Sequence, residues 1–337
     1  MLRKKTNTIM KKIALFSITF SILSHSALAD DWQDFLSGVE DELMQNNLDP
    51  AIFKKGMVGV KAPDSEVKTR LKTQPESTYT FADYRGRMVS DTRVKTGKEK
   101  LAEFSSVFDD VEAKYGVPRY VIVSLWGIES VFGTKQGNFG IIPSLATLAY
   151  QSHRKDFFRD ELIKSVRIVA EGHIELENLT GSWAGAMGQC QFMPSSFFLF
   201  AQDGNGDGRK DIWQTEADVF ASASNYLAKS GWQKDMNWGE AVTLTKFLPK
   251  LELSERGLSE LKPLSEWYKM GIAHKRTPKK GQGDANRMAR LFMPDGPSQR
   301  VYLVYENFEV IMKWNRSSYF AFSVLNLADR LAGKADL

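Results

Sequence analysis

The spacing of apolar residues along the chain predicts a mainly helical protein. Leu101, Phe104 and Phe108 recur at the interval of a helix that packs one face against a core. Gly116-Val117-Pro118 interrupts this pattern, and Pro118 is well placed to begin the next helix. The same spacing predicts helices within 30–60, 157–176, 215–232 and 303–337, and Pro194 is expected to start a further helix over 195–201.

Two segments depart from the helical pattern. Residues 61–100 are polar and contain Pro63 and Pro75, so we expect a loop-rich strap over the core. Residues 233–302 have short apolar runs punctuated by Gly and Pro, which indicates a small mixed α/β insertion. The expected main domain then spans 30–232 and 303–337.

The first 29 residues have the three parts of a secretory signal peptide. A basic start precedes an apolar run from Ile13 to Leu23, and Ala27-Leu28-Ala29 supplies an A-x-A cleavage site. The run is too short to span a bilayer, and no cysteine follows it as a lipid attachment point. We therefore expect a soluble periplasmic protein, cleaved after Ala29, with no stable membrane anchor.

Removal of this signal changes the charge balance. The full chain has 45 Lys and Arg against 41 Asp and Glu, and residues 1–29 hold five of the basic residues and none of the acidic ones. The mature chain is therefore near neutral, which disfavours nucleic-acid binding. Cys190 is the only cysteine, so the chain forms no internal disulfide and no thiol-based metal site.

Glu129 is the first candidate for chemistry. Val121 and Leu125 precede it by eight and four residues in the helix expected from Pro118, so they share its face, and Gly133 is expected to end that helix. An apolar face desolvates a carboxylate and favours its protonated form, which a general acid for a glycosidic oxygen requires. On this segment alone, a glutamate that reaches solvent or a lysine is the commoner arrangement.

A run of small residues forms the second candidate segment, Gly181-Ser182-Trp183-Ala184-Gly185-Ala186-Met187-Gly188. Such residues let backbone approach backbone or ligand closely. Ser182 and Gln191 add side chains suited to orienting a carboxyl group or a sugar hydroxyl, and Pro194 is expected to begin a helix. The alternative is a tightly packed turn between core helices.

Oxygen-bearing groups recur from residue 203 at the spacing of a calcium-binding loop, with Gly208 at its sixth position. Gln214 stands where such loops usually carry a glutamate, and Glu216 is a candidate for that last ligand. We expect Ca²⁺ of modest affinity in a structural role; a Gly/Asp-rich turn without metal is the alternative. The other ligand positions are Asp203, Asn205, Asp207 and the carbonyl of Arg209.

Together, two motifs resemble the membrane-bound lytic murein transglycosylase B family, glycoside hydrolase family 103. The first is Glu129-Ser130-x-Phe132-Gly133, and the second runs from Gly181 through Gln191-Phe192-Met193-Pro194-Ser195. The likeness extends over residues 84–325. It implies a lysozyme-like helical catalytic domain that acts on peptidoglycan glycan strands, with one catalytic glutamate, Glu129.

The resemblance also implies a mechanism. The family's glutamate protonates the glycosidic oxygen between N-acetylmuramic acid and N-acetylglucosamine, then takes the proton of the C6 hydroxyl, which closes a 1,6-anhydro ring without water. This chain agrees in that no second Asp or Glu stands out as a nucleophile. The resemblance further suggests cell-wall synthases as partners and Asp218 as the last calcium ligand.

Other family roles fall on matching positions. Ser182 matches the serine that hydrogen-bonds the catalytic glutamate, and Arg154-Lys155 match a basic pair that meets the peptidyl carboxylates. Trp314 and Phe320 stand where tyrosines are usual, and Gln189-Cys190 replaces a Tyr-Gly pair. The matching substrate-binding residues of the cleft are Tyr84, Gln191, Tyr226 and Asn315.

Three other hypotheses remain beside a lytic transglycosylase. A muramidase that admits water would leave reducing ends, so product analysis separates it. A non-catalytic peptidoglycan-binding protein is disfavoured by the intact Glu129, Ser182 and Gln191. A calcium-binding module with an incidental cleft is disfavoured because one imperfect loop is a small part of so long a chain.

Overall fold

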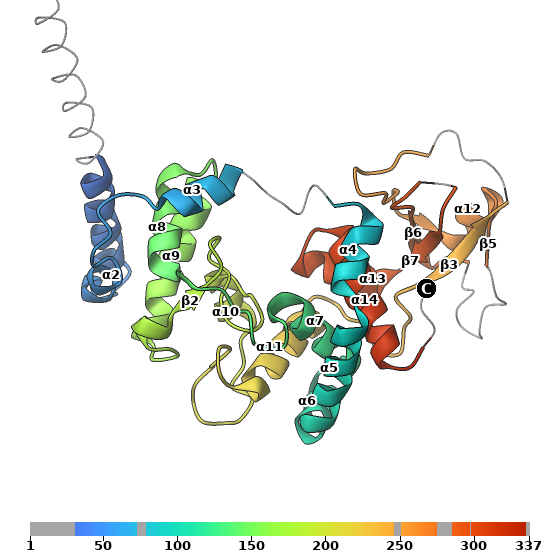
Figure 1. Cartoon of the computed structure of the whole chain (residues 1–337), viewed down its shortest axis with the longest axis horizontal. Coiled ribbons are helices and arrows are strands. Elements are labelled where there is room, and N and C mark those ends of the chain that lie inside the picture. The colour runs from blue at the N-terminus through green and yellow to red at the C-terminus, as the bar shows by residue number, and fades with distance from the viewer. Residues whose placement is uncertain (1–30, 73–78, 246–250, 275–284, 297, 335–337) are drawn as a thin grey trace, which may run out of the picture. The chain divides into compact units, whose positions relative to one another are not determined.

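The computed structural model describes residues 31–72, 79–245, 251–274, 285–296 and 298–334. Helices predominate in these ranges, which confirms the predicted fold class (Figure 1). The expected signal peptide, residues 1–29, lies outside the described residues. Within them, no helix combines the length and apolarity needed to cross a membrane. The chain divides into two compact units, each described by itself below.

The first unit comprises residues up to 74, 137–187 and 193–195. Its centre is a pair of packed helices, α8 (Ile141–Gln151) and α9 (Lys155–Ala170). Eight of the eleven residues of α8 are buried, because its apolar residues occupy almost every position. The shorter elements around this pair are a helix at 31–45, α2 (Pro50–Gly56), α3 (Ser65–Lys72), β1 (Phe139–Gly140), η2 (Leu176–Asn178) and β2 (Thr180–Gly181).

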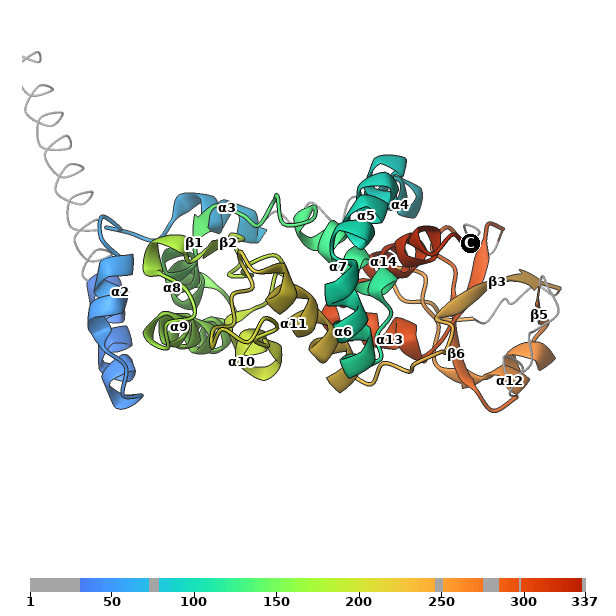
Figure 2. The same cartoon turned by 90° about the horizontal axis from the view of Figure 1, so that it is seen from below.

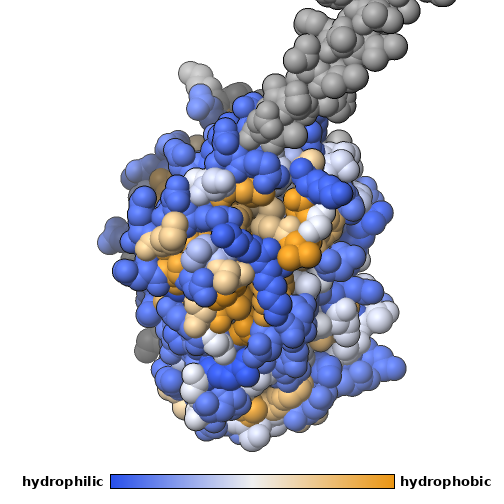
Figure 3. Space-filling view, turned by 90° about the vertical axis from the view of Figure 1, so that its left-hand side faces the viewer, coloured by the Kyte–Doolittle hydropathy of each residue, from blue (hydrophilic) through white to orange (hydrophobic). Residues whose placement is uncertain are grey.

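Aromatic packing and side-chain hydrogen bonds hold the N-terminal helices on this pair. Trp32 is fully buried, with its ring 5.1 Å from that of Tyr150 at the end of α8. Thr147 Oγ1 accepts the N–H of Asp64, just before α3, at 3.0 Å. In the view of Figure 3, hydrophilic residues surround a smaller apolar area on the surface that faces the viewer.

The second unit comprises residues 75–136, 188–192 and 196–337. In both views α7 and α14 lie side by side, and twelve of the fourteen residues of α14 are buried (Figures 1 and 2). Phe108 of α6 stacks on Phe220 of α11 at 4.4 Å. The helices are α4 (Phe81–Met88), α5 (Asp91–Glu103), α6 (Ser105–Tyr115), α7 (Arg119–Ser130), α11 (Glu216–Lys229), α13 (Glu306–Trp314) and α14 (Ser318–Leu331).

The prediction of a loop-rich strap over residues 61–100 is wrong. Three helices, α3, α4 and α5, occupy most of the described part of this segment. Each buries only one or two residues, among them Val67 in α3 and Val94 in α5, so none shows a full apolar stripe. Side-chain caps begin two of them: Thr80 Oγ1 accepts the N–H of Asp83, and Ser90 Oγ accepts that of Arg93.

A five-stranded antiparallel sheet lies between residues 239 and 304 of the second unit. Its strand order is β4-β6-β7-β3-β5, with Leu291 paired to Leu303 in the centre. Trp267 of α12 (Leu264–Lys269) is fully buried against this sheet, and its indole N–H donates to the carbonyl of Ala289. The strands are β3 (Gly239–Leu244), β4 (Lys262–Pro263), β5 (Ile272–His274), β6 (Met288–Phe292) and β7 (Val301–Val304).

Candidate active site

Glu129 is the penultimate residue of α7, which begins after Pro118 as predicted. The helix buries Val121, Ile122 and Leu125, the apolar residues expected to lie on or beside the face of Glu129. The glutamate itself is half-buried. This part of the sequence folds as expected because Pro118 fixes the first turn and the apolar face packs inward.

The end of α7 is strained. The helix stops at Ser130, and Val131 (φ 51°), Phe132 (φ 56°) and Gly133 (φ 82°) are all left-handed. Gly133 was predicted to end the helix, but the helix ends three residues earlier. Ser130 Oγ donates to the Trp126 carbonyl and accepts the N–H of Gly133 at 3.1 Å, which ties the turn together. A β-branched residue such as Val131 adopts this conformation only under strong constraint, and such strain concentrates at functional sites.

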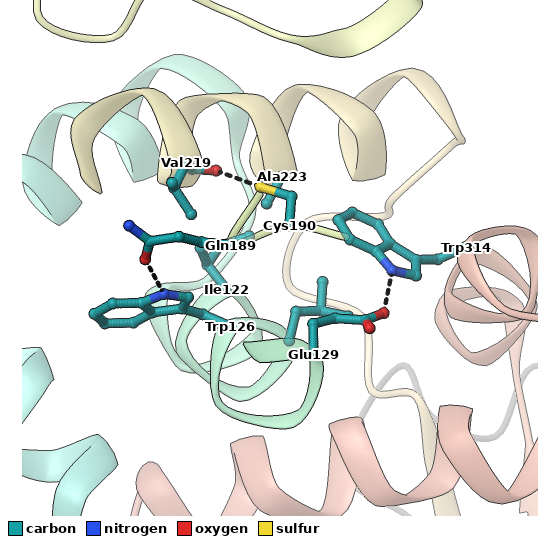
Figure 4. A pocket seen from close by; sticks show the side chains of 9 residues that line it. Ile122, Trp126, Glu129, Gln189, Cys190, Val219, Ala223 and Trp314 are labelled. Carbon is teal, nitrogen blue, oxygen red and sulfur yellow. Dashed lines mark hydrogen bonds between the residues drawn. The ribbon is translucent and has the colours of Figure 1, made fainter. Parts of the chain in front are cut away.

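A small pocket opens beside Glu129 within the second unit (Figure 4). Trp314, the last residue of α13, donates its indole Nε1–H to Glu129 Oε1 at 2.7 Å. Of the described residues that line this pocket, Glu129 is the only carboxylate. The lining residues are Ile122, Leu125, Trp126, Glu129, Gln189, Cys190, Val219, Ala223 and Trp314.

The wall opposite Glu129 is built by Gln189 and Cys190 (Figure 4). Gln189 Oε1 accepts the indole N–H of Trp126 at 2.6 Å, and its Nε2 donates to the carbonyl of Trp213. The Cys190 thiol donates to the carbonyl of Val219. Burial raises the pKa of this thiol, and the charge of Glu129 raises it further. Gln189 and Cys190 therefore form a closed wall of the pocket.

Aromatic rings support Trp314 from behind. Its ring lies 4.7 Å from that of Tyr226 and 5.2 Å from that of Phe192. The Tyr226 hydroxyl donates to the carbonyl of Lys313 at 2.7 Å. This places Tyr226, a predicted substrate-binding residue, beside Trp314, with its hydroxyl on the backbone of α13.

The other predicted cleft residues of the second unit are placed differently. Gln191 has φ 52°, and its Nε2 donates to the carbonyls of Gln136 and Gly188 at 3.0 and 2.9 Å. Tyr84 is only 4% exposed, which leaves little of its ring to meet a ligand. Asn315 is half-buried and caps its own turn by accepting the N–H of Ser317. Gln191 directly follows Cys190 of the pocket wall in the sequence. Tyr84, in contrast, belongs to the core.

Ser182, Arg154 and Lys155 belong to the first unit. Ser182 Oγ accepts the N–H of Ala186 at 3.0 Å, and its own N–H donates to the Ala186 carbonyl at 2.8 Å, so residues 182–186 form a tight turn. The hydroxyl proton of Ser182 is therefore available to donate elsewhere. Arg154 and Lys155 are exposed, and the Arg154 guanidinium stacks 3.9 Å from the Phe157 ring.

The turn around Ser182 depends on its small residues, as the sequence indicated. A Cβ on Gly181 would lie 2.1 Å from the Ala186 carbonyl oxygen, and one on Gly185 would lie 2.4 Å from Leu145 of α8. Any side chain there would push the turn from α8. The first unit thus holds Ser182 in a fixed place.

The predicted calcium loop precedes α11 in the second unit. Asp203 accepts backbone N–H groups from Gly206, Asp207 and Gly208, which folds the loop around its carboxylate. Hydrogen bonds from Asn205 and the Arg209 N–H lower the pKa of Asp207. The described residues contain no cluster of three or more His, Cys, Asp or Glu side chains suited to a metal. A cation here would depend on amide and carbonyl oxygens as well.

Asp218 closes the loop from α11. It is fully buried, and its two oxygens accept the N–H groups of Gly204 and Asp211 at 2.7 and 2.6 Å. Burial raises the pKa of Asp218 to about 6. The donor set is entirely oxygen, the type that Ca²⁺ takes. Glu216, the other candidate, lies in the first turn of α11.

Two contributors to the pocket were not found by reading the sequence. The sequence comparison indicated only that Trp314 lacks the hydroxyl of a tyrosine and that Gln189 departs from a Tyr-Gly pair. Both residues make specific hydrogen bonds in the pocket. Their side-chain chemistry could have indicated this role. An indole N–H and a primary amide are strong hydrogen-bond donors, and burying such a donor without an acceptor costs free energy.

The chain matches the family model of the transglycosylase SLT domain over residues 31–329. Membrane-bound lytic murein transglycosylase B of Escherichia coli (strain K12) is 29% identical over 250 residues, which are 74% of this chain and 66% of that protein. The chain thus spans slightly less than two thirds of that relative.

Solved structures of lytic transglycosylases are also similar to this chain. SltB3 from Pseudomonas aeruginosa, in complex with NAG-NAM-pentapeptide, is 34% identical, with a TM-score of 0.82 over 90% of this chain and 80% of that one. Escherichia coli lytic transglycosylase Slt35, in complex with calcium, is 25% identical, with a TM-score of 0.76 over 89% of this chain and 92% of that one. The chain therefore belongs to the transglycosylase SLT domain family, in its lytic transglycosylase B group.

Proposed function

We propose that the protein is a periplasmic lytic transglycosylase that cleaves the β-1,4 bond between N-acetylmuramic acid and N-acetylglucosamine in peptidoglycan. The observation that carries this proposal is the single carboxylate, Glu129, half-buried at a strained helix end in an apolar pocket. Family membership and two SltB3 complexes, with NAG-NAM-pentapeptide and NAG-anhNAM-pentapeptide, support it.

Glu129 acts first as acid and then as base. Its carboxyl gives a proton to the glycosidic oxygen, the bond between that oxygen and the muramoyl C1 breaks, and the substrate's own N-acetyl group stabilises the positive charge left at C1. The Glu129 carboxylate then takes the proton of the C6 hydroxyl while O6 bonds to C1. The products are a 1,6-anhydro end and a free 4-hydroxyl, and Glu129 ends protonated, as it began.

The absence of a second carboxylate among the described pocket residues favours this route over hydrolysis. Glycosidases that use water usually place a second Asp or Glu across the bond, and no carboxylate besides Glu129 is among the described residues that line this pocket. Ser182 as donor to Glu129, and Arg154-Lys155 as contacts for peptide carboxylates, stay predictions. So do Tyr84, Gln191, Tyr226 and Asn315 as substrate contacts, cell-wall synthases as partners, and the domain boundaries at 233–302.

Digestion of purified sacculi tests the function. Wild-type protein should release muropeptides with 1,6-anhydro ends, identified by mass spectrometry. Glu129→Gln keeps the shape of the side chain but cannot donate a proton, so the rate should fall by about 10²- to 10⁴-fold. Reducing ends in the wild-type digest would instead identify a muramidase, and a Glu129→Gln rate equal to wild type would overturn the assignment of the acid.

We also propose that the loop of Asp203, Asn205, Asp207, the Arg209 carbonyl and Asp218 binds Ca²⁺ in a structural role. The all-oxygen donor set supports this, as does a calcium complex of the similar Slt35. Bound calcium would supply charge that holds the loop against α11; it would take no part in bond cleavage.

A further inference from the structure

Trp314 is fixed on several sides at the end of α13. Its ring packs against Tyr226 and Phe192, and the Tyr226 hydroxyl holds the carbonyl of the preceding residue, Lys313. The indole is therefore presented to the pocket in one orientation. Its Nε1–H points at Glu129 Oε1 over 2.7 Å (Figure 4).

An indole N–H donates a hydrogen bond and accepts none. When Glu129 is ionised, the bond from Trp314 stabilises the charge on Oε1. When Glu129 is protonated, the carbonyl oxygen of the acid is a much better acceptor than its hydroxyl oxygen. The donor from Trp314 then keeps Oε1 as the carbonyl, and the acidic proton resides on Oε2.

A tyrosine at this position would not make that distinction. A phenol both donates and accepts, so it pairs with either oxygen in either protonation state. Because Trp314 can only donate, its observed bond to Oε1 distinguishes the two oxygens of Glu129 in a way that a phenol would not.

We propose that Trp314 is a positioning residue that assigns the two oxygens of Glu129 different roles. Oε1 is anchored by the indole, and Oε2 releases the proton to the glycosidic oxygen and takes up the proton of the C6 hydroxyl. Both transfers then occur at one oxygen without rotation of the carboxyl group. This inference rests on the proposed function of Glu129.

Other titratable groups do not complicate the site at neutral pH or below. Of the described residues that line the pocket from α7, α11, α13 and the segment around residue 190, only Glu129 and Cys190 titrate. Burial raises the pKa of the Cys190 thiol above its usual range, so it stays neutral there. Asp218 and Glu161, whose pKa values burial also raises, lie outside this lining, and the control variant below keeps both of them.

Trp314→Phe tests the assignment, because it keeps an aromatic ring against Tyr226 and removes the donor together with the smaller ring that carries it. On soluble, uncrosslinked glycan strands we expect kcat to fall about tenfold with KM unchanged, in line with the loss of one hydrogen bond to a charged group. The limb of the pH profile where activity is lost as Glu129 ionises should move to higher pH, since the anion loses a stabilising partner. A profile that superimposes on the wild type would overturn the proposal.

Trp238→Phe is the matched control. Trp238 is a buried tryptophan of the same unit, and its Nε1–H donates to the Asp329 carboxylate at 2.8 Å, outside the pocket. This variant should lose stability like Trp314→Phe but keep the wild-type pH profile. An equal shift in both variants would show that the effect is one of general stability, and the proposal would fail.

A measurement without catalysis separates this inference from the proposed function. In protein labelled with ¹⁵N at tryptophan, the indole resonance that disappears in Trp314→Phe should move with pH along the titration of Glu129. In Glu129→Gln the pH dependence should vanish. A Trp314 resonance that is insensitive to pH refutes the assignment even if Glu129→Gln is inactive. A Glu129→Gln variant with full activity refutes the proposed role of Glu129 as the acid even if the resonance titrates.

Discussion

Glu129 in α7 and Glu161 in α9 are both acidic residues on the apolar side of a helix, and they are used differently. Glu161 is 1% exposed; its Oε1 accepts the hydroxyl of Ser195 at 2.6 Å and its Oε2 accepts the N–H of Ser195 at 2.8 Å. Glu129 is half-buried beside a pocket and receives an indole N–H at Oε1.

The two carboxylates differ in the groups that they accept hydrogen bonds from. Ser195 is the second residue of α10 (Pro194–Phe200), where the backbone N–H has no partner inside the helix. Glu161 satisfies that N–H from another helix and so serves the fold. Glu129 instead lines a small pocket, where its Oε1 accepts the indole N–H of Trp314. Burial alone therefore does not separate the structural glutamate from the proposed catalytic one, whereas the partners of their oxygens differ.

The largest effect on stability should come from Glu161→Ala. It leaves the N–H and hydroxyl of Ser195 without their charged acceptor, which should lower the free energy of unfolding by about 3 kcal/mol. Urea denaturation measures this loss, and well below the unfolding transition the digestion of sacculi should stay near the wild-type rate.

Glu175→Ala is the control for that loss. Glu175 is an exposed glutamate of the same unit, and its removal should change stability by less than about 0.5 kcal/mol. Equal losses in the two variants, or an inactive but folded Glu161→Ala, would remove the distinction between a structural and a catalytic glutamate.

A third carboxylate, Asp218, extends the comparison because it accepts backbone N–H groups at both of its oxygens. If its loop binds Ca²⁺, calcium at ten times its Kd should add about 1.4 kcal/mol of stability. Asp203→Ala plus Asp207→Ala should abolish the calcium-dependent rise in Tm, whereas the exposed pair Asp34→Ala plus Asp41→Ala should keep it. A rise that persists in the loop variant would contradict a calcium site there.

The smallest expected effect is the change of stability with pH. Burial raises the pKa of Glu161 above its ordinary value, so the folded state holds this proton more tightly than the unfolded chain. The stability from that proton is full below the unfolded pKa and is lost as pH rises through the folded pKa. Glu161→Gln does not titrate, so the stability advantage of wild type over it should shrink between about pH 4 and neutral pH. Urea unfolding across this range checks the sign, and a widening gap would refute it.

Features set by local sequence were predictable. Pro118 and Pro194 begin helices where the chain indicated, because a proline ring is compatible with a first helical turn. The apolar residues around Glu129 also lie where their spacing places them. Similarly, the small residues from Gly181 form the tight turn that their lack of side chains allows.

Features set by distant partners were not predictable. The helices α3 to α5 bury too few residues to show a stripe, so their polar sequence resembled a loop. The bond from Trp314 to Glu129 joins residues 185 positions apart, and that from Ser195 to Glu161 joins residues 34 apart. No local pattern encodes such pairs. The resemblance to a family with tyrosine at the position of Trp314 indicated only a missing hydroxyl.

The single thiol of the chain has a consequence for how the protein matures. Cys190 is buried and has a raised pKa, so the thiolate that reacts with oxidants and disulfides is scarce. With no second cysteine, the chain has no disulfide isomers to sort. In an oxidising compartment it can therefore reach its folded state without an isomerase, and folding itself then shields the sulfur beside Glu129 from oxidation.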